Sequence, residues 1–244
     1  MDTIGSEQRV SGIVVAAALV AAGLLAAAIA FGILFKQSRT VRTVQVVGAA
    51  TRAFESDIAK WRLSLSMPVA GGDLTQGYAS LSQDVALLVE RLRAAGFADT
   101  AINLQPVSSQ PQWNREGERS GYVLQQPLFV VSTDVDAIER LALAPGNVLP
   151  AGIALEYSQL EYFYSGIAEL KHSLLADATR DAQARAEEIV GSTDGDLGSI
   201  VEARAGVFQI TEPYSTETSG GGVHSTATRR KEITVTVHAR FALE

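Results

Sequence analysis

The sequence predicts an α+β protein in which a single N-terminal transmembrane helix precedes a domain of two long helices packed on a mixed or antiparallel sheet. Three observations point to this fold class. Residues 12–35 contain no charged side chain, several later segments alternate apolar and polar residues as half-buried strands do, and two segments carry apolar residues at helical spacing. The expected organisation is a tail at 1–11, the membrane helix at 12–35, a basic linker at 36–42 and the α+β domain at 43–244.

The apolar segment at 12–35 has the length of a membrane-spanning helix. Its 24 residues would extend about 36 Å as a helix, whereas the hydrocarbon core of a bilayer is about 30 Å thick. A cleaved signal peptide is the main alternative, because Ala28-Ile29-Ala30 resembles a cleavage site. The apolar run continues to Phe35, however, and only Arg9 is basic before it. We therefore expect an uncleaved, single-pass anchor.

Four alanines in this segment are candidates for association between membrane helices. Ala18, Ala22, Ala26 and Ala30 recur every four residues and would lie on one face of a helix. Small side chains let two helix backbones approach closely in a membrane. The alternative is that the segment is simply rich in alanine, and the spacing leaves both interpretations open.

The residues that flank the segment leave its orientation open. Lys36, Arg39 and Arg42 follow it, and the positive-inside rule taken literally would keep the domain in the cytoplasm. Long domains, however, translocate largely regardless of charge. Composition alone does not decide the side.

The composition excludes several kinds of chemistry. The chain of 244 residues has no cysteine, which rules out disulfides, a thiolate nucleophile and any cysteine-ligated metal. Its histidines, His172, His224 and His238, fall on separate predicted elements, so we expect no metal site. Residues 43–244 carry 16 basic and 25 acidic residues, and their net charge of −9 argues against nucleic-acid binding.

The first clear elements of the domain are a strand and a long helix. Residues 59–67 alternate between apolar and polar, which predicts a strand with one buried face. Asp73 is a candidate N-cap and Gly96 a candidate C-cap of the helix that follows. Its apolar stripe consists of Leu74, Tyr78, Leu81, Val85, Leu88 and Leu92. We expect Leu81, Val85 and Leu88 of this stripe to be buried against the sheet, beside Trp61, Leu63 and Leu65.

The middle of the domain predicts two strands and a short helix. The strands fall near 101–110 and 122–132, and the polar stretch at 111–121 is expected to be a long hairpin connection. Thr133 is expected to cap a short helix that stops at Pro145.

The last third predicts three more strands and a second long helix. Residues 153–164 are strand-like with a shift of phase that predicts a bulge near Ser158. A helix is expected at about 167–190, with the stripe Leu170, Leu174, Ala178, Ala182, Ala186 and Ile189. The final strands are expected at 199–211, interrupted near Gly206, and at 233–241.

A loop at 212–228 separates the last two strands. It contains Gly220-Gly221-Gly222 and no apolar residue spaced to dock, so we expect it to be flexible and dispensable for folding. The basic triplet that follows, Arg229-Arg230-Lys231, is expected to be the solvated start of a strand.

Motifs for catalysis are missing from the sequence. There is no GxSxG, HExxH, Walker A or GxGxxG pattern, and Asp194-Gly195-Asp196 lacks the later ligands of a calcium loop. We therefore expect no catalytic residues, no cofactor and no enzymatic activity.

Several motifs together resemble the SIMPL-domain family. Val44-Gln45-Val46-Val47-Gly48 and Asp57-Ile58-Ala59-Lys60-Trp61 are similar to its opening, which has a Val-rich strand, a Gly and an Asp-x-Ala motif entering the second strand. Residues 176–187 resemble its Ala/Arg-patterned helix, and Leu197-Gly198-Ser199-Ile200 resembles the step into the next strand. Gly206-Val207-Phe208-Gln209-Ile210 is similar to a segment of the membrane-anchored bacterial branch. The resemblance covers about 41–243.

The resemblance implies an α+β fold in a bacterial envelope protein that faces the periplasm or the cell exterior. Some members assemble into large ring-like or channel-like homo-oligomers, and some are linked to stress tolerance. The family offers no catalytic residues to carry over. The resemblance therefore favours a single-pass protein of the inner membrane whose C-terminal domain is extracytoplasmic, despite the basic linker.

Three functions follow, in order of preference. The first is a non-enzymatic, membrane-anchored envelope protein that acts as a homo-oligomeric scaffold or channel-like assembly with a role in stress tolerance. The second is a module that binds a small ligand or polymer through the loops at 111–121 and 212–228, with Trp113, Tyr122 and Tyr214 at its mouth. The third is a hydrolase with a dispersed carboxylate pair.

Overall fold

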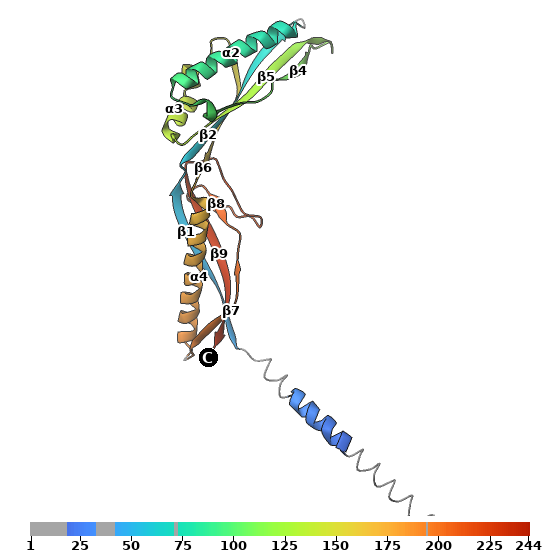
Figure 1. Ribbon diagram of the computed structural model, residues 1–244, viewed down its shortest axis with the longest axis vertical. Coiled ribbons are helices and arrows are strands. Elements are labelled where there is room, and N and C mark those ends of the chain that lie inside the picture. The colour runs from blue at the N-terminus through green and yellow to red at the C-terminus, as the bar shows by residue number, and fades with distance from the viewer. Residues whose placement is uncertain (1–18, 33–41, 71–72, 194) are drawn as a thin grey trace, which may run out of the picture. The chain divides into compact units, whose positions relative to one another are not determined.

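The structure is a computed structural model that describes residues 19–32, 42–70, 73–193 and 195–244 (Figure 1). Contacts divide the chain into two compact units. The smaller unit contains the described part of residues 1–47 together with Ala182–Arg204 and His238–Glu244. The larger unit contains the described part of residues 48–181 together with Ala205–Val237.

Residues 19–32 form a helix inside the predicted membrane segment. Among the residues that the structure describes, no helix is both long enough and apolar enough to cross a membrane. The rest of the segment predicted at 12–35 lies outside the described residues, as does Ala18, whereas Ala22, Ala26 and Ala30 belong to this helix. Membrane anchoring and helix association therefore stay predictions.

The domain has the predicted α+β fold, built on two sheets. The first sheet has the order β1-β9-β7 with β8 on β9, and consists of β1 (Thr43–Glu55), β7 (Leu197–Ala205), β8 (Gln209–Thr211) and β9 (Arg230–Leu243). The second has the order β3-β5-β2-β6 with β4 on β5, and consists of β2 (Ile58–Ala70), β3 (Ile102–Leu104), β4 (Ser108–Trp113), β5 (Arg119–Ser132) and β6 (Ala154–Phe163). The helices are α2 (Leu74–Ala94), α3 (Val135–Leu143) and α4 (Ile167–Gly191). The strand pairs of the second sheet are antiparallel.

The second sheet buries one face beneath α2 and α3 (Figure 1). The alternation predicted for β2 is confirmed, because Trp61, Leu63 and Leu65 are almost fully buried. Four stripe residues of α2 join the same core: Leu81, Val85, Leu88 and Leu92. The caps of α2 are also confirmed. The Asp73 carboxylate accepts a hydrogen bond of 3.1 Å from the backbone N–H of Gln76, and Gly96 has a φ of +100°.

Tyr78 departs from the predicted stripe of α2, because its side chain is 40% exposed. Gly77 is buried instead. A Cβ atom at Gly77 would lie 2.4 Å from Cγ2 of Val69, so the helix approaches β2 more closely than any side chain would permit. This close contact leaves the neighbouring Tyr78 facing solvent.

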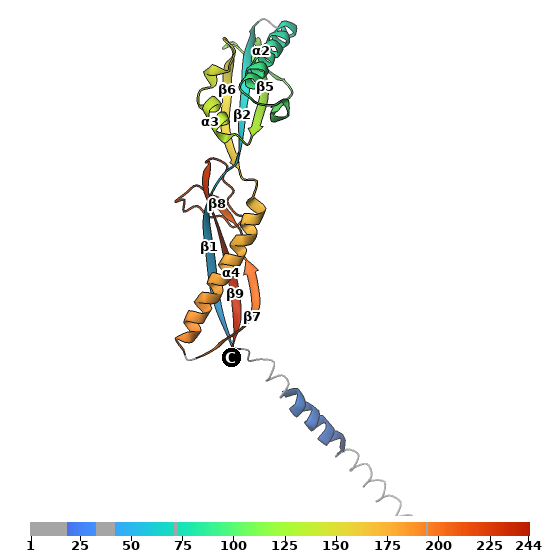
Figure 2. The same ribbon diagram turned by 60° about the vertical axis from the view of Figure 1, so that its left-hand side comes forward.

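The first sheet packs one face against α4, which lies along β1 and β9 (Figure 2). In the larger unit this interface contains Leu170, Leu174, Ala178, Ile233, Val235 and Val237. In the smaller unit it contains Val46, Ala182, Ala186, Ala239 and Phe241. The predicted stripe fails only at its end, where Ile189 is half-exposed and Val190 is buried. A step of four residues from Ala186 keeps Val190 on the face that covers the sheet.

The connection predicted at 111–121 is mostly strand. β4 extends through Trp113 and β5 begins at Arg119, which leaves 114–118 as the turn. Asn114 closes the turn, since its Oδ1 accepts hydrogen bonds from the backbone N–H groups of Glu116 and Glu118 at 3.0 and 2.8 Å. All six residues of β4 are exposed, so no alternation of apolar residues marks this strand in the sequence.

Two predicted irregularities of the strands are confirmed. The bulge in β6 falls at Glu156, two residues before the predicted position, where the pairing with β2 shifts between Tyr157 and Leu155. The interruption predicted near Gly206 separates β7, which ends at Ala205, from β8. The bulge follows from the change of phase that the sequence shows at 153–164.

The loop at 212–228, which the sequence predicts to be flexible, is hydrogen-bonded to β8 through the side chain of Gln209. Its Nε2 donates to the carbonyl oxygen of Ser219 at 2.8 Å, and its Oε1 accepts from the backbone N–H of Val223 at 2.7 Å. Ile210 adds backbone hydrogen bonds to Val223 and Ser225. The loop is therefore held by hydrogen bonds from a polar side chain outside it, a contact that the lack of apolar docking residues within the loop does not reveal.

Candidate functional site

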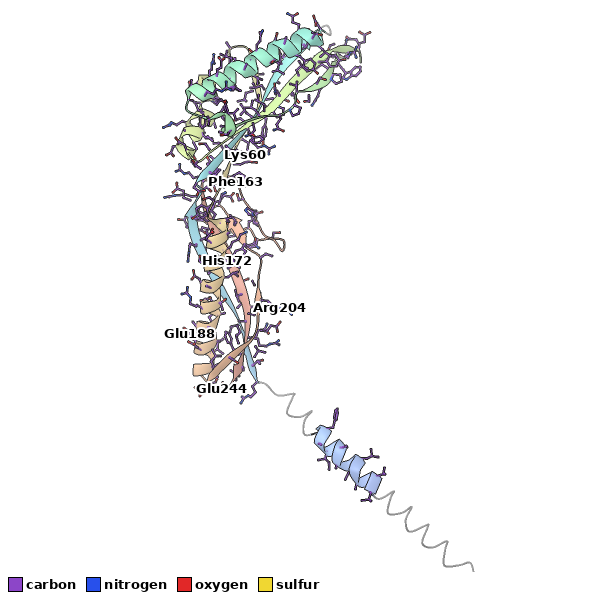
Figure 3. The ribbon with its side chains drawn as sticks, in the orientation of Figure 1. Lys60, Phe163, His172, Glu188, Arg204 and Glu244 are labelled. Atoms are coloured by element: carbon purple, nitrogen blue, oxygen red, sulfur yellow. The ribbon has the colours of Figure 1, made fainter. Side chains whose placement is uncertain are left out.

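Polar side chains gather in the larger unit where the two sheets are joined. The chain passes from β1 to β2 at Ser56 and Asp57, and from β6 to α4 after Phe163, which is labelled in Figure 3. Backbone hydrogen bonds link these crossings, from Asp57 to Phe163 at 3.1 Å and from Ser56 to Arg229 at 2.9 Å. We name these side chains the junction cluster: Glu55, Asp57, Asp136, Glu139, Tyr162, Ser165, Glu212, His224, Arg229 and Lys231.

Arg229 is the centre of an ionic network in this cluster. Its Nη1 lies 2.5 Å from Asp136 Oδ1 and 3.4 Å from Glu139 Oε2 on α3, and its Nε lies 2.7 Å from Glu55 Oε1 on β1. The hydrogen bond and charge of Arg229 lower the pKa of Asp136. In return, the hydrogen bond to Asp136 raises the pKa of Arg229. The network ties β1 to α3 through one guanidinium.

Tyr162 extends the network into the core. Its hydroxyl donates a hydrogen bond of 2.8 Å to Glu139 Oε1. Burial, together with this hydrogen bond and the charge of Glu139, raises the pKa of Tyr162 to about 12. The phenol therefore stays protonated at neutral pH and acts as a donor.

Asp57 holds the start of α4. Its carboxylate accepts a hydrogen bond of 2.8 Å from the backbone N–H of Ser165 and a second one from the Ser165 hydroxyl. Partial burial opposes the charge of Asp57, but the bonds from Ser165 outweigh it, so the pKa of Asp57 is lowered. Ala59, two residues on, is fully buried in the core. The Asp-x-Ala motif thus has a structural role here.

Lys231 and His224 line a small cavity of about 90 Å³ beside this network. Lys231 is only 3% exposed, and its Nζ donates a hydrogen bond of 2.5 Å to the carbonyl oxygen of Tyr162. Burial lowers the pKa of Lys231, and the nearby Glu212 partly offsets this. Burial also lowers the pKa of His224, as do the charges of Lys171 and Lys231.

Glu212 joins the loop that follows β8 to this cluster. The hydroxyl of Ser225 donates a hydrogen bond to Glu212 Oε1, and this bond lowers the pKa of Glu212. The charged groups of the junction cluster are thus engaged with one another, with hydroxyls or with the backbone. Asp136 and Glu139 do converge, but on Arg229, and the lowered pKa of Asp136 is opposite to what a general acid requires.

Of the three residues predicted for a ligand-binding mouth, Tyr214 borders a depression that the other two do not line. Tyr214 is 95% exposed, has a φ of +63° and borders a depression of about 330 Å³ formed with β1 and the start of β9. Neither Trp113 nor Tyr122 lines that depression. Trp113 instead ends β4, and Tyr122 lies on β5 with Arg119 5.2 Å from its ring centre.

No metal centre was expected because the three histidines of the sequence fall on separate predicted elements. All three histidines are exposed: His172 lies on α4, His238 on β9 and His224 in the junction cluster. Among the described residues, no group of three or more His, Cys, Asp or Glu side chains is placed to hold an ion.

Sequence reasoning missed Arg229 and Lys231, which were expected to be solvated. Lys231 is buried because β9 presents odd-numbered residues to α4, and Lys231 precedes Ile233, Val235 and Val237 in that phase. This phase is visible in the sequence. For Arg229 no local pattern gives a signal, since its three carboxylates come from Glu55, Asp136 and Glu139.

Comparison with known proteins places the chain in a family. No curated protein matches it. The family described as SIMPL, a protein of unknown function (DUF541), matches residues 44–241, which is nearly the whole domain after the linker. The chain therefore belongs to the SIMPL (DUF541) family.

Proposed function

We propose that this protein is a membrane-anchored, non-enzymatic scaffold of the bacterial envelope that works as a homo-oligomer. Residues 43–244 lie on the extracytoplasmic side, and residues 12–35 hold them at the inner membrane. A channel-like assembly and a part in stress tolerance are the specific forms of this role that the family resemblance favours.

The observation that carries the proposal is the junction cluster. Its ionisable groups have displaced pKa values, which often mark catalytic sites. Here, however, they contact one another around the two chain crossings, with Arg229 joining β1 to α3 and Asp57 joining the start of β2 to the start of α4. A network of this kind stabilises a fixed geometry, which is the property that a scaffold needs.

An edge strand of the second sheet supports self-association. β6 is the last strand in the order of this sheet, and it exposes Tyr157 and Phe163 by 42% and 40%. At Tyr162 the edge is occupied, because the N–H donates to the carbonyl oxygen of Thr226 at 2.9 Å and the carbonyl oxygen accepts from Lys231. The part of β6 before Tyr162 is the part that can present backbone donors and acceptors to another chain. By contrast, Pro111 lies inside β4 on the opposite side of the sheet and cannot donate a ladder hydrogen bond. The β6 edge is therefore the better site for contact between copies.

The anchoring part of the proposal rests on the sequence at 12–35. This run has 24 residues without a charge, and residues 19–32 within it are helical. A run of this length suits a bilayer span. The extracytoplasmic side rests on the family resemblance and on the weak influence of flanking charge on long domains.

Protease accessibility tests anchoring and side together. After carbonate extraction of isolated membranes, the protein should still sediment with the membranes. Protease added to sealed spheroplasts should digest residues 43–244 while a cytoplasmic marker stays intact. Release by carbonate would contradict anchoring. Protection of the domain until the membrane is opened with detergent would contradict the extracytoplasmic side.

A further inference from the structure

The uncovered face of the first sheet carries a depression in the smaller unit. Its volume is about 490 Å³, and it is lined by Gln45, Glu202, Arg204, His238, Ala239 and Arg240. Ala239 and Phe241 pack against α4, so His238 and Arg240 point to the opposite side of β9. Figure 3 shows Arg204 beside β7, on the side of the sheet away from Glu188 of α4. Three strands thus supply one open, polar hollow.

The charge in this hollow is positive although the domain as a whole is acidic. Glu202 lies between two guanidinium groups, with Oε1 2.8 Å from Arg204 Nε and Oε2 bonded to Arg240 Nη2. One carboxylate therefore serves two arginines, which leaves a net charge of +1 before His238 is considered. Residues 43–244 carry a net charge of −9, so the positive charge of this hollow is opposite in sign to that of the domain as a whole.

The arginines keep donors available for a ligand. Among the described residues, Arg204 is paired through Nε alone, and 80% of its side chain is exposed. Each guanidinium is a planar fork of donors, which suits phosphate or carboxylate oxygens. Gln45 and His238 add polar groups at the rim.

We propose that this depression binds an oxyanion of the phosphate class. The source is either free phosphate or the headgroup of an anionic phospholipid. Residues 36–42 separate the predicted anchor from β1 and span at most about 25 Å, so a headgroup is within reach of Gln45. The proposal goes beyond the scaffold role and does not depend on it, because free phosphate needs no membrane to bind.

Calorimetric titration of the full-length protein in an uncharged detergent, at low ionic strength, tests the site with inorganic phosphate. The double substitution Arg204→Gln/Arg240→Gln should weaken binding by about tenfold or more. The control Arg93→Gln/Arg180→Gln removes two arginines of similar exposure, each paired with one carboxylate, and should leave the affinity unchanged. Glu202→Gln should tighten binding by about threefold, because it removes the internal competitor.

Native mass spectrometry of the same proteins separates the two sources. Retention of phosphatidylglycerol but not phosphatidylcholine, lost in Arg204→Gln/Arg240→Gln, identifies a lipid headgroup. Phosphate binding without lipid retention identifies a free oxyanion. The proposal is overturned if the wild-type protein binds neither probe, if the control variant loses binding equally, or if Glu202→Gln binds more weakly. Unfolding of a variant can only lower its affinity, so the predicted gain of affinity in Glu202→Gln cannot result from unfolding.

Discussion

Asp57 holds the crossing from β6 into α4 with its carboxylate. Both oxygens accept hydrogen bonds from Ser165, one from the backbone and one from the hydroxyl. The ionised form accepts these bonds better than the protonated form, which is why folding lowers the pKa of Asp57 below its ordinary value of 3.8. The resulting stabilisation is complete above that value and is lost as the pH falls through the lower pKa of the folded state.

The first prediction concerns this carboxylate. Asp57→Asn should lower the free energy of unfolding by about 1 kcal/mol at pH 7, after allowance for exposure to solvent. The difference from wild type should begin to shrink below about pH 3.8, where the carboxyl of the unfolded state becomes protonated, and should be lost below the lower pKa of the folded state. Urea unfolding at pH 7 and pH 3 measures it, with Asp84→Asn on α2 as the control. An equal difference at both pH values would contradict the assigned role.

At the scale of elements, α2 offers two adjacent leucines with opposite environments. Leu88 is fully buried against the second sheet, whereas Leu87 is 39% exposed. Leu88→Ala should cost about 2–5 kcal/mol of unfolding free energy, because it leaves a cavity in the core. Leu87→Ala makes the same change of helix propensity as Leu88→Ala but leaves no buried cavity. It should change the free energy of unfolding by about 0.5 kcal/mol or less. Similar losses in both variants would show that α2 does not pack as described.

The loop at 212–228 gives a prediction opposite to the one its sequence suggests. Deletion of residues 219–223 removes both loop partners of Gln209 and should lower the melting temperature by several degrees. Gln209→Ala should reproduce part of this loss, since it leaves the same backbone groups unpaired. Thermal unfolding followed by circular dichroism measures both. An unchanged melting temperature in both variants would show that these hydrogen bonds do not stabilise the fold and that the loop is dispensable.

The predicted membrane segment has its own test of association. Replacement of Ala22 and Ala26 by leucine keeps the segment apolar but fills the groove between small residues. Crosslinking of the isolated anchor segment in membranes should then fall sharply. Leucine at Val20 and Ala28, on the opposite side of a helix, leaves the alanine face intact and serves as the control. Unchanged crosslinking in the alanine variant would make the segment a passive tether.

At the scale of the whole molecule, elements with a regular pattern follow from the sequence, and contacts between distant segments do not. β2, α2, α4 and β9 are confirmed because each has a continuous apolar face. β4 was missed because both of its faces are exposed. The junction cluster was missed because the three carboxylates that pair with Arg229 come from distant parts of the sequence, and only the folded chain brings them together. Lys231 is the exception, since its place in the phase of β9 already indicated burial.

The mass of the full-length protein in detergent tests the scaffold proposal most directly. Mass photometry or light scattering, corrected for bound detergent, should give a whole-number multiple of the 25.8 kDa chain that is larger than one. The species should persist on dilution, because a scaffold requires a stable interface. A mass equal to one chain at every concentration would contradict a homo-oligomer and would favour a monomeric binding module.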